Sequence, residues 1–550
     1  MNFIENESAT KLRGGYYTDL DIALFLTEWV LEISPARILE PSCGDGVFIE
    51  SIRKSGKPFP KSIKAFEIDS VEAKKALSRA TLLNNVTTDI LEKDFIEWAY
   101  LKLPRPLNFD AVVGNPPFIR YQYLDDGHQV LMQKAFEYFK LPFTKHTNAW
   151  VAFVILSLAH LRAGGRLAMV VPSELLHVLH AQSLRDYLAE HCSKILIIDP
   201  EELWFTNALQ GVVLLLAEKK EEGASKGQGI AITKVREREF LKGKPSAYFN
   251  SACYSNGEVV KGKWMSALLT QKERDLLKEV YKHPSVHKFE EIADVDVGIV
   301  TGANKFFLVS DEVIEEFGLS PWAHPMFGRS EHARGVVYDR KTHKENKKAG
   351  LPANFLWFDS TEITALPKKV QEYIRKGEEE GLHLRYKCRI RSPWYKVPSV
   401  YTSPVGMLKR CHGYPRLILN KAEAFTTDTA YRITVKGVVS EHLVFSFVNS
   451  LTALSAELEG RHYGGGVLEL VPSEIERVLV PIAQPAPDSL ERLDYEIRHG
   501  ASADDVLLRQ DSYVLKEIGL DKDERRTLNT AWARLRDRRQ RVPTTPGEGE

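Results

Sequence analysis

The stretch "FDAVVGNPPFIRY" (residues 109–121) decides the fold of the first half of this chain. An apolar run leads directly into Asn-Pro-Pro-Phe, which predicts a buried strand followed by a rigid turn. Because prolines donate no N–H, the acceptors at this turn are the Asn115 side-chain oxygen and the Pro116 carbonyl, beside the ring of Phe118. Such a group can hold a planar amine, with the oxygens accepting its hydrogens and the ring stacking on its face.

Short apolar runs like this one recur and alternate with helix-like segments. The runs are residues 36–39, 63–68, 109–114, 166–171, 194–198 and 211–217, and the helix-like segments are residues 22–31, 47–55, 71–81, 147–161 and 181–190. This alternation predicts an α/β domain with a mostly parallel, twisted sheet and helices on both faces. Ligands of such sheets bind beyond the carboxyl ends of the strands, so we expect a site just after these runs.

A glycine turn follows the first of these strands. In "ILEPSCGDGVF" (residues 38–48), Glu40 ends the strand, and Gly44 and Gly46 allow the backbone to approach a ligand closely. The turn is not GxGxxG, and no lysine-bearing phosphate loop follows. It therefore suits a nucleoside-like cofactor without a pyrophosphate, although a plain strand-to-helix turn would look similar.

Acidic residues follow the next two runs. Glu67 and Asp69 in "AFEID" (residues 65–69) lie about 20 residues beyond the glycine turn, where an acid in nucleotide-binding sheets accepts hydrogen bonds from ribose hydroxyls. An acid at this point can also be a helix N-cap. In "KDF" (residues 93–95), Asp94 can accept from an adenine amino group and Phe95 can pack on the ring.

Composition excludes several classes of protein. The 550 residues are 43% hydrophobic and 27% charged, typical of a globular chain of two to four domains. The apolar stretches are too short for a membrane span, and the polar, acidic N-terminal segment does not resemble a signal peptide. Five scattered cysteines without CxxC predict neither disulfides nor a metal site, and favour the cytoplasm.

The second half of the sequence has a different character. Short β-like runs broken by glycine, proline and aromatic residues extend over residues 289–485, and a charged, helix-rich segment follows. Linker-like stretches occupy residues 219–229 and 481–487, and residues 542–550 are typical of a disordered tail. We expect three domains: α/β over residues 1–245, α+β over residues 246–485, and a helical extension over residues 486–550.

The net charge is zero, with 74 basic and 74 acidic residues, but one window is strongly basic. Residues 382–416 contain eight Lys or Arg, no Asp or Glu, and interleaved aromatic residues. Such a segment can bind phosphates and stack on or between bases, although many charged runs are only solvated surface. The candidate DNA-binding residues are Arg385, Lys387, Arg389, Arg391, Trp394, Tyr395, Lys396, Lys409 and Arg410.

The order of the motifs resembles that of a known family. "GGYYT" (residues 14–18), "EPSCGDGVF", "FEID", "DF" and "NPPF" occur as in the gamma-class, TaqI-type, S-adenosylmethionine-dependent adenine-N6 DNA methyltransferases of restriction-modification systems. "VGIVTGANKFF" (297–307), "RSPWY" (391–395), "NKAEAFTTDTAYRI" (420–433) and "EGRHYGGGVLELVPSE" (459–474) resemble recurring segments of their target-recognition domains. The resemblance covers residues 10–485. Asp19 departs from it, because the family usually has proline there.

The resemblance implies a Rossmann-like methyltransferase domain, a DNA target-recognition domain, and methylation of an adenine flipped out of double-stranded DNA. Asn115 and the Pro116 carbonyl would accept the two amino hydrogens, and Phe118 would stack on the base. Trp204 or Phe205 would supply a second aromatic contact, and the sequence does not decide between them. The implied cofactor residues are Tyr17, Thr18, Glu40, Pro41, Cys43, Gly44, Glu67, Ile68, Asp94, Phe95 and Asn115.

Other functions share the Asn-Pro-Pro-Phe motif. They include cytosine-N4 methylation of DNA, whose enzymes usually carry serine at the position of Asn115, and methylation of RNA or of protein glutamine. A non-catalytic nucleic-acid-binding protein is disfavoured by the intact motif, whereas the large basic and aromatic second half favours DNA as substrate. No nuclease centre is evident in the sequence, so we expect any cognate endonuclease to be a separate chain, and this enzyme to act as a monomer.

Overall fold

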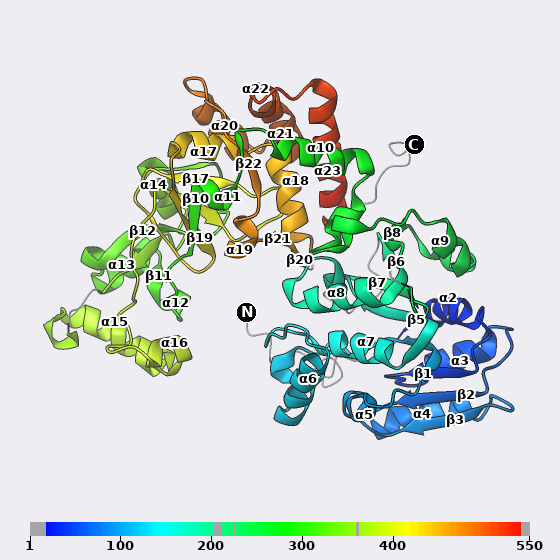
Figure 1. Ribbon diagram of the computed structural model, residues 1–550. Helices are drawn as coiled ribbons and strands as arrows, with labels where there is room; N and C mark the ends of the chain where they lie inside the picture. The colour runs from blue at the N-terminus through cyan, green and yellow to red at the C-terminus, as the bar shows by residue number, and fades with distance from the viewer. Residues whose placement is uncertain (1–17, 202–210, 225, 359–361, 464, 541–550) are drawn as a thin grey trace. The chain divides into compact units, whose positions relative to one another are not determined.

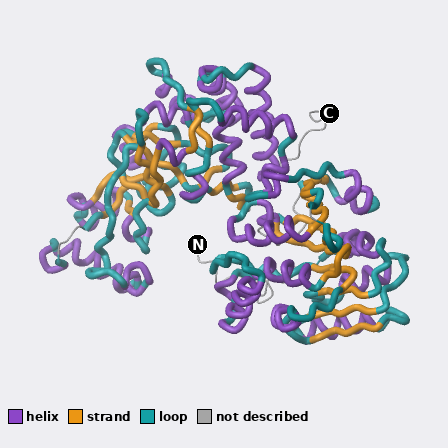
Figure 2. The backbone as a smooth tube through the Cα atoms, in the orientation of Figure 1, coloured by secondary structure: helices purple, strands orange, loops and turns teal. Residues whose placement is uncertain are grey.

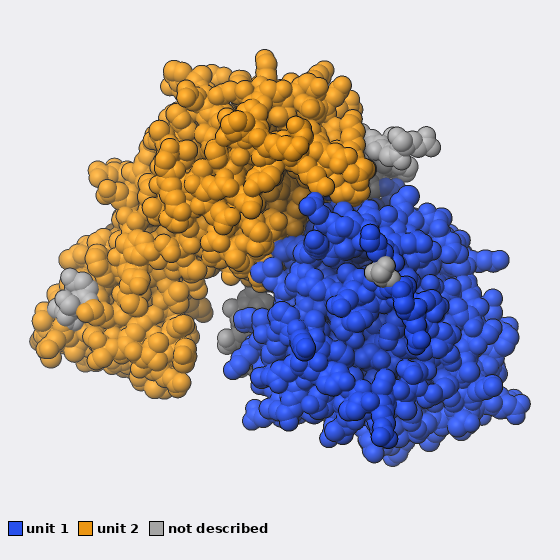
Figure 3. Space-filling view, in the orientation of Figure 1, with its two compact units in different colours: residues 1–269, 463–465, 541–550 blue, residues 270–462, 466–540 orange. Residues whose placement is uncertain are grey.

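The computed structural model describes residues 18–201, 211–224, 226–358, 362–463 and 465–540. The chain forms two compact units (Figure 3). Unit 1 comprises residues 1–269, 463–465 and 541–550, and unit 2 comprises residues 270–462 and 466–540. The division into three domains at residues 245 and 485 stays a prediction.

Unit 1 is built on an eight-stranded sheet with the order β3-β2-β1-β4-β5-β7-β6-β8. Its strands are β1 Arg37–Glu40, β2 Ser62–Phe66, β3 Thr87–Leu91, β4 Phe109–Gly114, β5 Leu161–Pro172, β6 Cys192–Pro200, β7 Val212–Lys219 and β8 Gly229–Val235. Only the pairings of β7 with β5 and with β6 are antiparallel. The predicted mostly parallel α/β fold is confirmed.

Helices cover both faces of this sheet (Figure 1). They are α2 Leu20–Leu31, α3 Val47–Lys54, α4 Ser70–Ala80, α5 Phe95–Lys102, α6 Asp126–Tyr138, α7 Ala149–Ala159, α8 Gln182–His191 and α9 Pro245–Ser251. The alternation of side chains along β2 shows the two layers. Ala65 belongs to the core beneath α2, α3 and α4, whereas Phe66 contacts Phe95 of α5, with ring centroids 5.5 Å apart.

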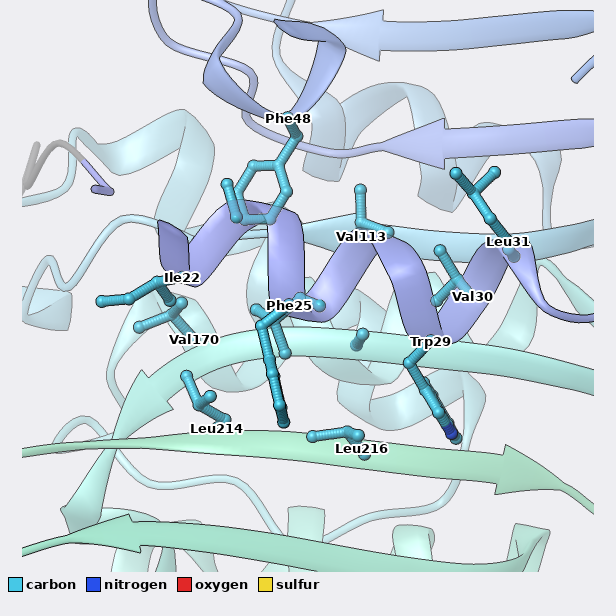
Figure 4. Packing of buried hydrophobic residues seen from close by; sticks show 14 of the residues in the cluster. Ile22, Phe25, Trp29, Val30, Leu31, Phe48, Val113, Val170, Leu214 and Leu216 are labelled. Carbon is cyan, nitrogen blue, oxygen red and sulfur yellow. The ribbon is translucent and has the colours of Figure 1, made fainter. Parts of the chain in front are cut away.

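Helix α2 carries much of the first core layer (Figure 4). Its Phe25, Trp29 and Val30 are fully or almost fully buried, and the rings of Phe25 and Trp29 point toward strand residues such as Leu214 and Leu216. Trp29 also contacts Phe249 of α9 at 4.8 Å, so α9 packs onto the same layer. Burial of large side chains such as these supplies most of the stabilisation of an α/β core.

The sequence did not predict β3, β8, α5 or α6 as elements. Strand β3 ("TTDIL") is an edge strand with no fully buried side chain, so it lacks the apolar run on which the prediction relied. Helix α6 ("DGHQVLMQKAFEY") is mostly polar, and only Met132, Ala135 and Phe136 are buried. Elements with so little buried apolar surface leave a weak periodic signal.

Unit 2 combines short strands with many helices, as expected for an α+β region (Figure 2). The larger sheets have the orders β10-β19-β15-β17-β13 and β11-β14-β12-β18. The strands after residue 270 are β9 Val286–Lys288, β10 Ala293–Val297, β11 Leu308–Val309, β12 Ala323–Phe327, β13 Val337–Tyr338, β14 Asn354–Leu356, β15 Val405–Leu408, β16 Arg410–Cys411, β17 Leu417–Asn420, β18 Phe425–Thr426, β19 Ala430–Val435, β20 Arg461–Tyr463, β21 Val467–Glu469 and β22 Leu479–Pro481.

The helices of unit 2 include the predicted helical segment near the C-terminus. They are α10 Gln271–Tyr281, α11 Phe289–Ile292, α12 Asn304–Phe307, α13 Asp311–Phe317, α14 Arg340–Lys348, α15 Lys368–Glu379, α16 Tyr386–Arg389, α17 Ser440–Ser446, α18 Ser450–Glu459, α19 Pro472–Ile475, α20 Ser489–Arg498, α21 Ala503–Asp511, α22 Val514–Glu517 and α23 Lys522–Gln540. None of the helices within the described ranges is both long and apolar enough to span a membrane.

A buried ion pair ties α23 to α18. The side chains of Arg539 and Glu457 are fully buried, and Arg539 Nη2 lies 2.6 Å from Glu457 Oε1. Burial favours the protonated form of Glu457, but the charge of Arg539 and the hydrogen bonds from Arg539 and His462 outweigh it and lower the pKa to about 2. Helix α23 is therefore part of the core of unit 2.

The glycine turn offers a direct test of the packing. Gly46 has φ +85°, and a Cβ at this position would lie 2.8 Å from Ala76 Cα of α4. We expect Gly46→Ala to lower the free energy of unfolding by about 1–3 kcal/mol more than Gly56→Ala does. Gly56 is the matched control, because it also has positive φ but a Cβ there would meet nothing within 4 Å. Urea unfolding of both variants measures the difference, and equal losses would contradict the close approach of α4.

Candidate active site

A pocket of about 470 Å³ lies at the carboxyl ends of β1, β2 and β4 in unit 1. This is where ligands bind in open parallel sheets, and the volume is typical of small-molecule sites. The predicted cofactor residues among its lining are Thr18, Pro41, Cys43, Gly44, Glu67, Ile68, Asp94, Phe95 and Asn115. The turns after β1, β2, β3 and β4, which are distant in sequence, are therefore brought together at one edge of the sheet.

The two glycines of the first turn serve different purposes. Gly44 lines the pocket, has φ +51°, and a Cβ there would meet no atom within 4 Å. Gly46 instead makes room for α4, as its distance from Ala76 shows. The expectation that both glycines admit a ligand is therefore supported only for Gly44. Cys43 between β1 and α3 is buried, and burial raises the pKa of its thiol well above the usual range.

The two acids after β2 both line the pocket but make different contacts. Glu67 lines the pocket, and its carboxylate accepts hydrogen bonds from the N–H of Gly44 and the N–H of Asp69, both at 2.9 Å. Asp69 caps α4, accepting from Val71 N at 2.9 Å. Thus Glu67 holds the glycine turn and faces the pocket, while Asp69 performs the N-cap role that the sequence left open.

Glu40 precedes the turn that lines the pocket and does not line the pocket itself, but it is the most unusual acid next to it. It is 1% exposed at the end of β1, and within the described part of the chain neither of its carboxylate oxygens has a hydrogen-bond partner. Burial raises its pKa well above the usual range, and the negative charges of Asp45 and Glu67 raise it further. A buried carboxyl without a partner is costly, so this position suits a cation supplied by a ligand.

Asn115 joins the glycine turn to the N-terminal segment. Its Nδ2 donates to Thr18 Oγ1 at 3.1 Å, and its backbone carbonyl accepts from Ser42 Oγ at 3.0 Å. The hydrogen bond to Thr18 turns the amide nitrogen toward that residue and places Oδ1 on the opposite side of the amide. The turn is also anchored downstream, because Ala149 N donates to Ile119 O at 2.8 Å.

Pro116 and Phe118 do not line the pocket itself. Pro116 is buried, whereas Phe118 is half-buried and packs against the core layer formed by α2 and α3. Within the Asn-Pro-Pro-Phe turn, Asn115 therefore lines the pocket, whereas Phe118 lies outside the pocket lining.

The segment at the start of α6 adds site residues that no motif in the sequence predicted. His128 lies between two acids, with Nε2 3.3 Å from Asp94 Oδ2 and Nδ1 hydrogen-bonded to Asp125. Burial alone would lower the pKa of His128, but the hydrogen bond to Asp125 and the charge of Asp94 raise it. Burial raises the pKa of Asp94. All three side chains line the pocket. The polar string "YLDDGH" (residues 123–128) soon after Asn-Pro-Pro-Phe was the available signal.

Three of the expected site residues, Tyr17, Trp204 and Phe205, lie outside the described residues. Asp19, where the resembling family usually has proline, forms an ion pair with Arg238. No group of three or more His, Cys, Asp or Glu among the described residues could hold a metal ion.

In unit 2 the basic segment divides into internal and exposed charges. Arg391 donates to the carbonyls of Thr301 and Val300 at 2.7 and 2.6 Å. Lys409 and Arg410 both pair with Glu469, at 3.3 and 2.6 Å. Trp394 and Tyr395 are buried in an aromatic core. Exposed side chains without a carboxylate partner among the described residues are Arg385, Lys387, Arg389 and Lys396.

Comparisons with known proteins identify the chain's relatives. Residues 2–293 match the N-6 DNA Methylase family, and residues 261–515 match the C-terminal domain of the type II methyltransferase M.Eco57I. The chain is 25% identical to the type II methyltransferase M.AccI of Acinetobacter calcoaceticus over 84% of each chain. It is 22% identical to M.XamI of Xanthomonas campestris pv. amaranthicola over 85% of each. The structure of the type IIG restriction endonuclease BpuSI superposes with a TM-score of 0.44 and 16% identity, covering 97% of this chain and 67% of that one.

The chain belongs to the N-6 DNA methylase family, whose members use S-adenosylmethionine as methyl donor. It is a site-specific adenine-N6 DNA methyltransferase, of the type that serves as the modification enzyme of type II restriction-modification systems. The predictions of the family, of the enzyme class and of adenine rather than cytosine as the methylated base are therefore confirmed.

The buried Glu40 carboxyl predicts a pH-dependent stability. Because its folded pKa is raised, the folded ligand-free protein holds a proton that the unfolded chain releases above about pH 4.5. Stability is therefore lost as pH rises above 4.5. The loss in the free energy of unfolding is about 1.4 kcal/mol for each unit by which the pKa is raised. Because glutamine does not titrate, Glu40→Gln should remove this loss.

Thermal unfolding of ligand-free protein at pH 5 and pH 8 measures this effect. Relative to wild type, Glu40→Gln should gain more stability at pH 8 than at pH 5, whereas Glu92→Gln on the exposed surface of unit 1 should show the same small effect at both. An equal effect of Glu40→Gln at both pH values would show that Glu40 is ionised and paired in the folded protein.

Proposed function

We propose that this enzyme binds S-adenosylmethionine in the unit 1 pocket and methylates the N6 amino group of an adenine flipped out of double-stranded DNA. One observation supports the proposal most strongly. The Asn115 amide lies in the wall of the pocket and is hydrogen-bonded to Thr18, while its backbone is held by the turn that follows β1. The methylated site would be protected from a cognate endonuclease carried by a separate chain, and the enzyme would act as a monomer.

The residues of the pocket fit the cofactor. The Glu40 carboxyl has no partner among the described residues and would neutralise the cofactor's ammonium group. Glu67 already accepts from two backbone N–H groups, and its remaining lone pairs would accept from ribose hydroxyls. Asp94 would accept from the adenine amino group, with Phe95 beside the ring. Tyr17, Thr18, Pro41, Cys43, Gly44 and Ile68 would complete the contacts.

Binding of the adenine would displace an existing interaction. Asp94 Oδ2 is engaged by His128 at 3.3 Å, so the incoming amino group would compete with this histidine or share the carboxylate with it. At low pH a protonated His128 would hold Asp94 more strongly. His128 would therefore influence cofactor binding through Asp94 and would take no direct part in methyl transfer.

At the reacting centre the protein contributes acceptors and position. S-adenosylmethionine supplies an electrophilic methyl group when bound. Asn115 Oδ1 and the Pro116 carbonyl would accept the two amino hydrogens of the target, which shifts the nitrogen toward sp³ geometry and directs its lone pair at the methyl group. An amide also costs less than a carboxylate to desolvate beside an aromatic ring. Catalysis then depends mainly on orientation and electrostatics, and the proton leaves after transfer.

The target base would occupy the surface next to the pocket. Phe118 is only half-buried, and its ring would stack on the flipped base. Trp204 or Phe205 would provide the opposite contact. Flipping is required because the N6 group is paired and stacked inside a duplex.

Substitution of Asn115 tests the catalytic assignment. We expect Asn115→Ala to lower kcat by roughly 10²–10³-fold, the usual effect of removing one group that stabilises a transition state. Methyl transfer from labelled S-adenosylmethionine to DNA, followed by nucleoside analysis, measures it. Asn256→Ala, an exposed residue outside the pocket, should behave as wild type. A kcat within threefold of wild type for Asn115→Ala would remove Asn115 from the mechanism.

The salt dependence of DNA binding tests which basic side chains of unit 2 contact phosphates and which are held in internal ion pairs. Lys396 is exposed without a carboxylate partner among the described residues, whereas Lys409 pairs with Glu469 at 3.3 Å. Lys396→Ala should reduce the slope of log K against log salt by about 0.9, the contribution of one phosphate contact. Lys409→Ala should leave the slope unchanged. The reverse pattern would show that the ion pair with Glu469 opens to bind DNA.

A further inference from the structure

An exposed apolar cluster lies at the end of α15 in unit 2. Leu384, Tyr386 and Ile390 are 67%, 63% and 63% exposed, and they lie within seven residues of sequence in and around the short helix α16. Figure 1 shows α16 beside α15 at one end of this unit. Single exposed apolar residues are common, but three large ones together mark a binding surface. We call these three residues the apolar tip.

Cations surround the apolar tip. Arg385, Lys387 and Arg389 alternate with its residues, and none has a carboxylate partner among the described residues. Lys387 Nζ lies 5.6 Å and Arg389 Cζ 5.5 Å from the centre of the Tyr386 ring. An apolar surface framed by unpaired positive charge is complementary to stacked bases between phosphates, and apolar side chains commonly insert between base steps of duplex DNA.

The backbone beneath the tip is firmly supported. Cys388 on the inner face of α16 is fully buried, and its Sγ lies 3.8 Å from the Thr301 carbonyl. Arg391 holds the same carbonyl and that of Val300. Gly302, with φ +79°, approaches so closely that a Cβ there would lie 2.7 Å from Lys387 Cβ. A group that separates stacked bases needs such rigid support, because unstacking costs free energy.

A basic pocket adjoins the tip. It has a volume of about 620 Å³, is lined by Ile390 of the tip and by the adjacent Lys387, and is also lined by Arg391, Lys396 and Arg432. No acidic residue contributes to its lining among the described residues. The sugar-phosphate backbone next to an inserted side chain would find positive charge there.

We propose that the apolar tip is a wedge that inserts between stacked bases of duplex DNA, with Tyr386 as the leading ring. The inference rests on the proposed DNA methyltransferase function and adds a device that distorts the duplex. The cations of α16 and the adjoining pocket hold the flanking phosphates while the wedge lowers the cost of separating the base pairs.

Tyr386→Ala tests the wedge against a matched control. Tyr495→Ala removes a tyrosine of equal exposure, 62%, from the same unit, where its ring stacks on His499. The methylation site is first mapped with wild-type enzyme on genomic DNA, and a failure at this step would refute the proposed function and not the wedge. Bending of a duplex containing the site is then followed by energy transfer between labels at its two ends.

The wedge predicts that Tyr386→Ala bends the duplex less and methylates it about tenfold more slowly, in the range of one lost base–aromatic stack. A mismatched target base is already partly unstacked, so the wedge is less needed there. On such a duplex the methylation rate of Tyr386→Ala should return to within about twofold of the wild-type rate. Tyr495→Ala should match wild type in both assays, and unchanged thermal unfolding of both variants verifies their folding.

Two results would overturn the wedge. One is normal bending and methylation by Tyr386→Ala. The other is loss of binding to anionic phosphatidylserine vesicles by Tyr386→Ala while DNA bending is retained, which would assign the same surface to a membrane.

Discussion

The site depends on the parallel pairing of β1 with β4. Leu39 lies opposite Val112 in this register, so the turn after Glu40 and the turn after Gly114 emerge at the same edge of the sheet. Gly114 has no side chain, and a Cβ there would lie 3.3 Å from Pro41, so the two turns pack against each other. The hydrogen bond from Ser42 to the Asn115 carbonyl follows from this proximity. A shift of one residue in register would reverse the side chains of the strand and separate the acceptors from the pocket.

The electrostatics of the pocket link cofactor binding to stability. Glu40 is buried without a partner among the described residues, so the ligand-free protein carries an unfavourable interaction that a bound cation would relieve. A ligand that binds only the folded state stabilises that state. Neutralising the Glu40 carboxyl would strengthen the binding of a cationic ligand to the folded protein and so increase this stabilisation. Asp94 differs from Glu40, because His128 already contacts its carboxylate and a ligand would add less stabilisation there. The two ends of the pocket thus differ in how much they gain from the ligand.

The sequence predicted the parts of the site that follow buried strands, because apolar runs and turn residues carry local signals. The strand-end position alone did not separate Glu67 from Asp69, and only the family resemblance selected Glu67, since the difference depends on which carboxylate caps α4. The sequence missed His128, whose role arises only when the polar helix α6 packs beside α5. The basic window contains no acid, yet Glu469 reaches Lys409 and Arg410 from a strand more than fifty residues later. Local composition does not report charge supplied by a distant segment.

The ion pair between Arg539 and Glu457 also constrains how the protein is made. Glu457 is fully buried on α18, and its counter-ion is translated 82 residues later. Domains generally fold as units, starting with the N-terminal one, while the ribosome is still adding residues. Unit 1 draws most of its chain from residues 1–269 and can form early, whereas unit 2 must wait for α23 before Glu457 is neutralised. A chain that ends before residue 539 would therefore contain a complete unit 1 and an unfinished unit 2.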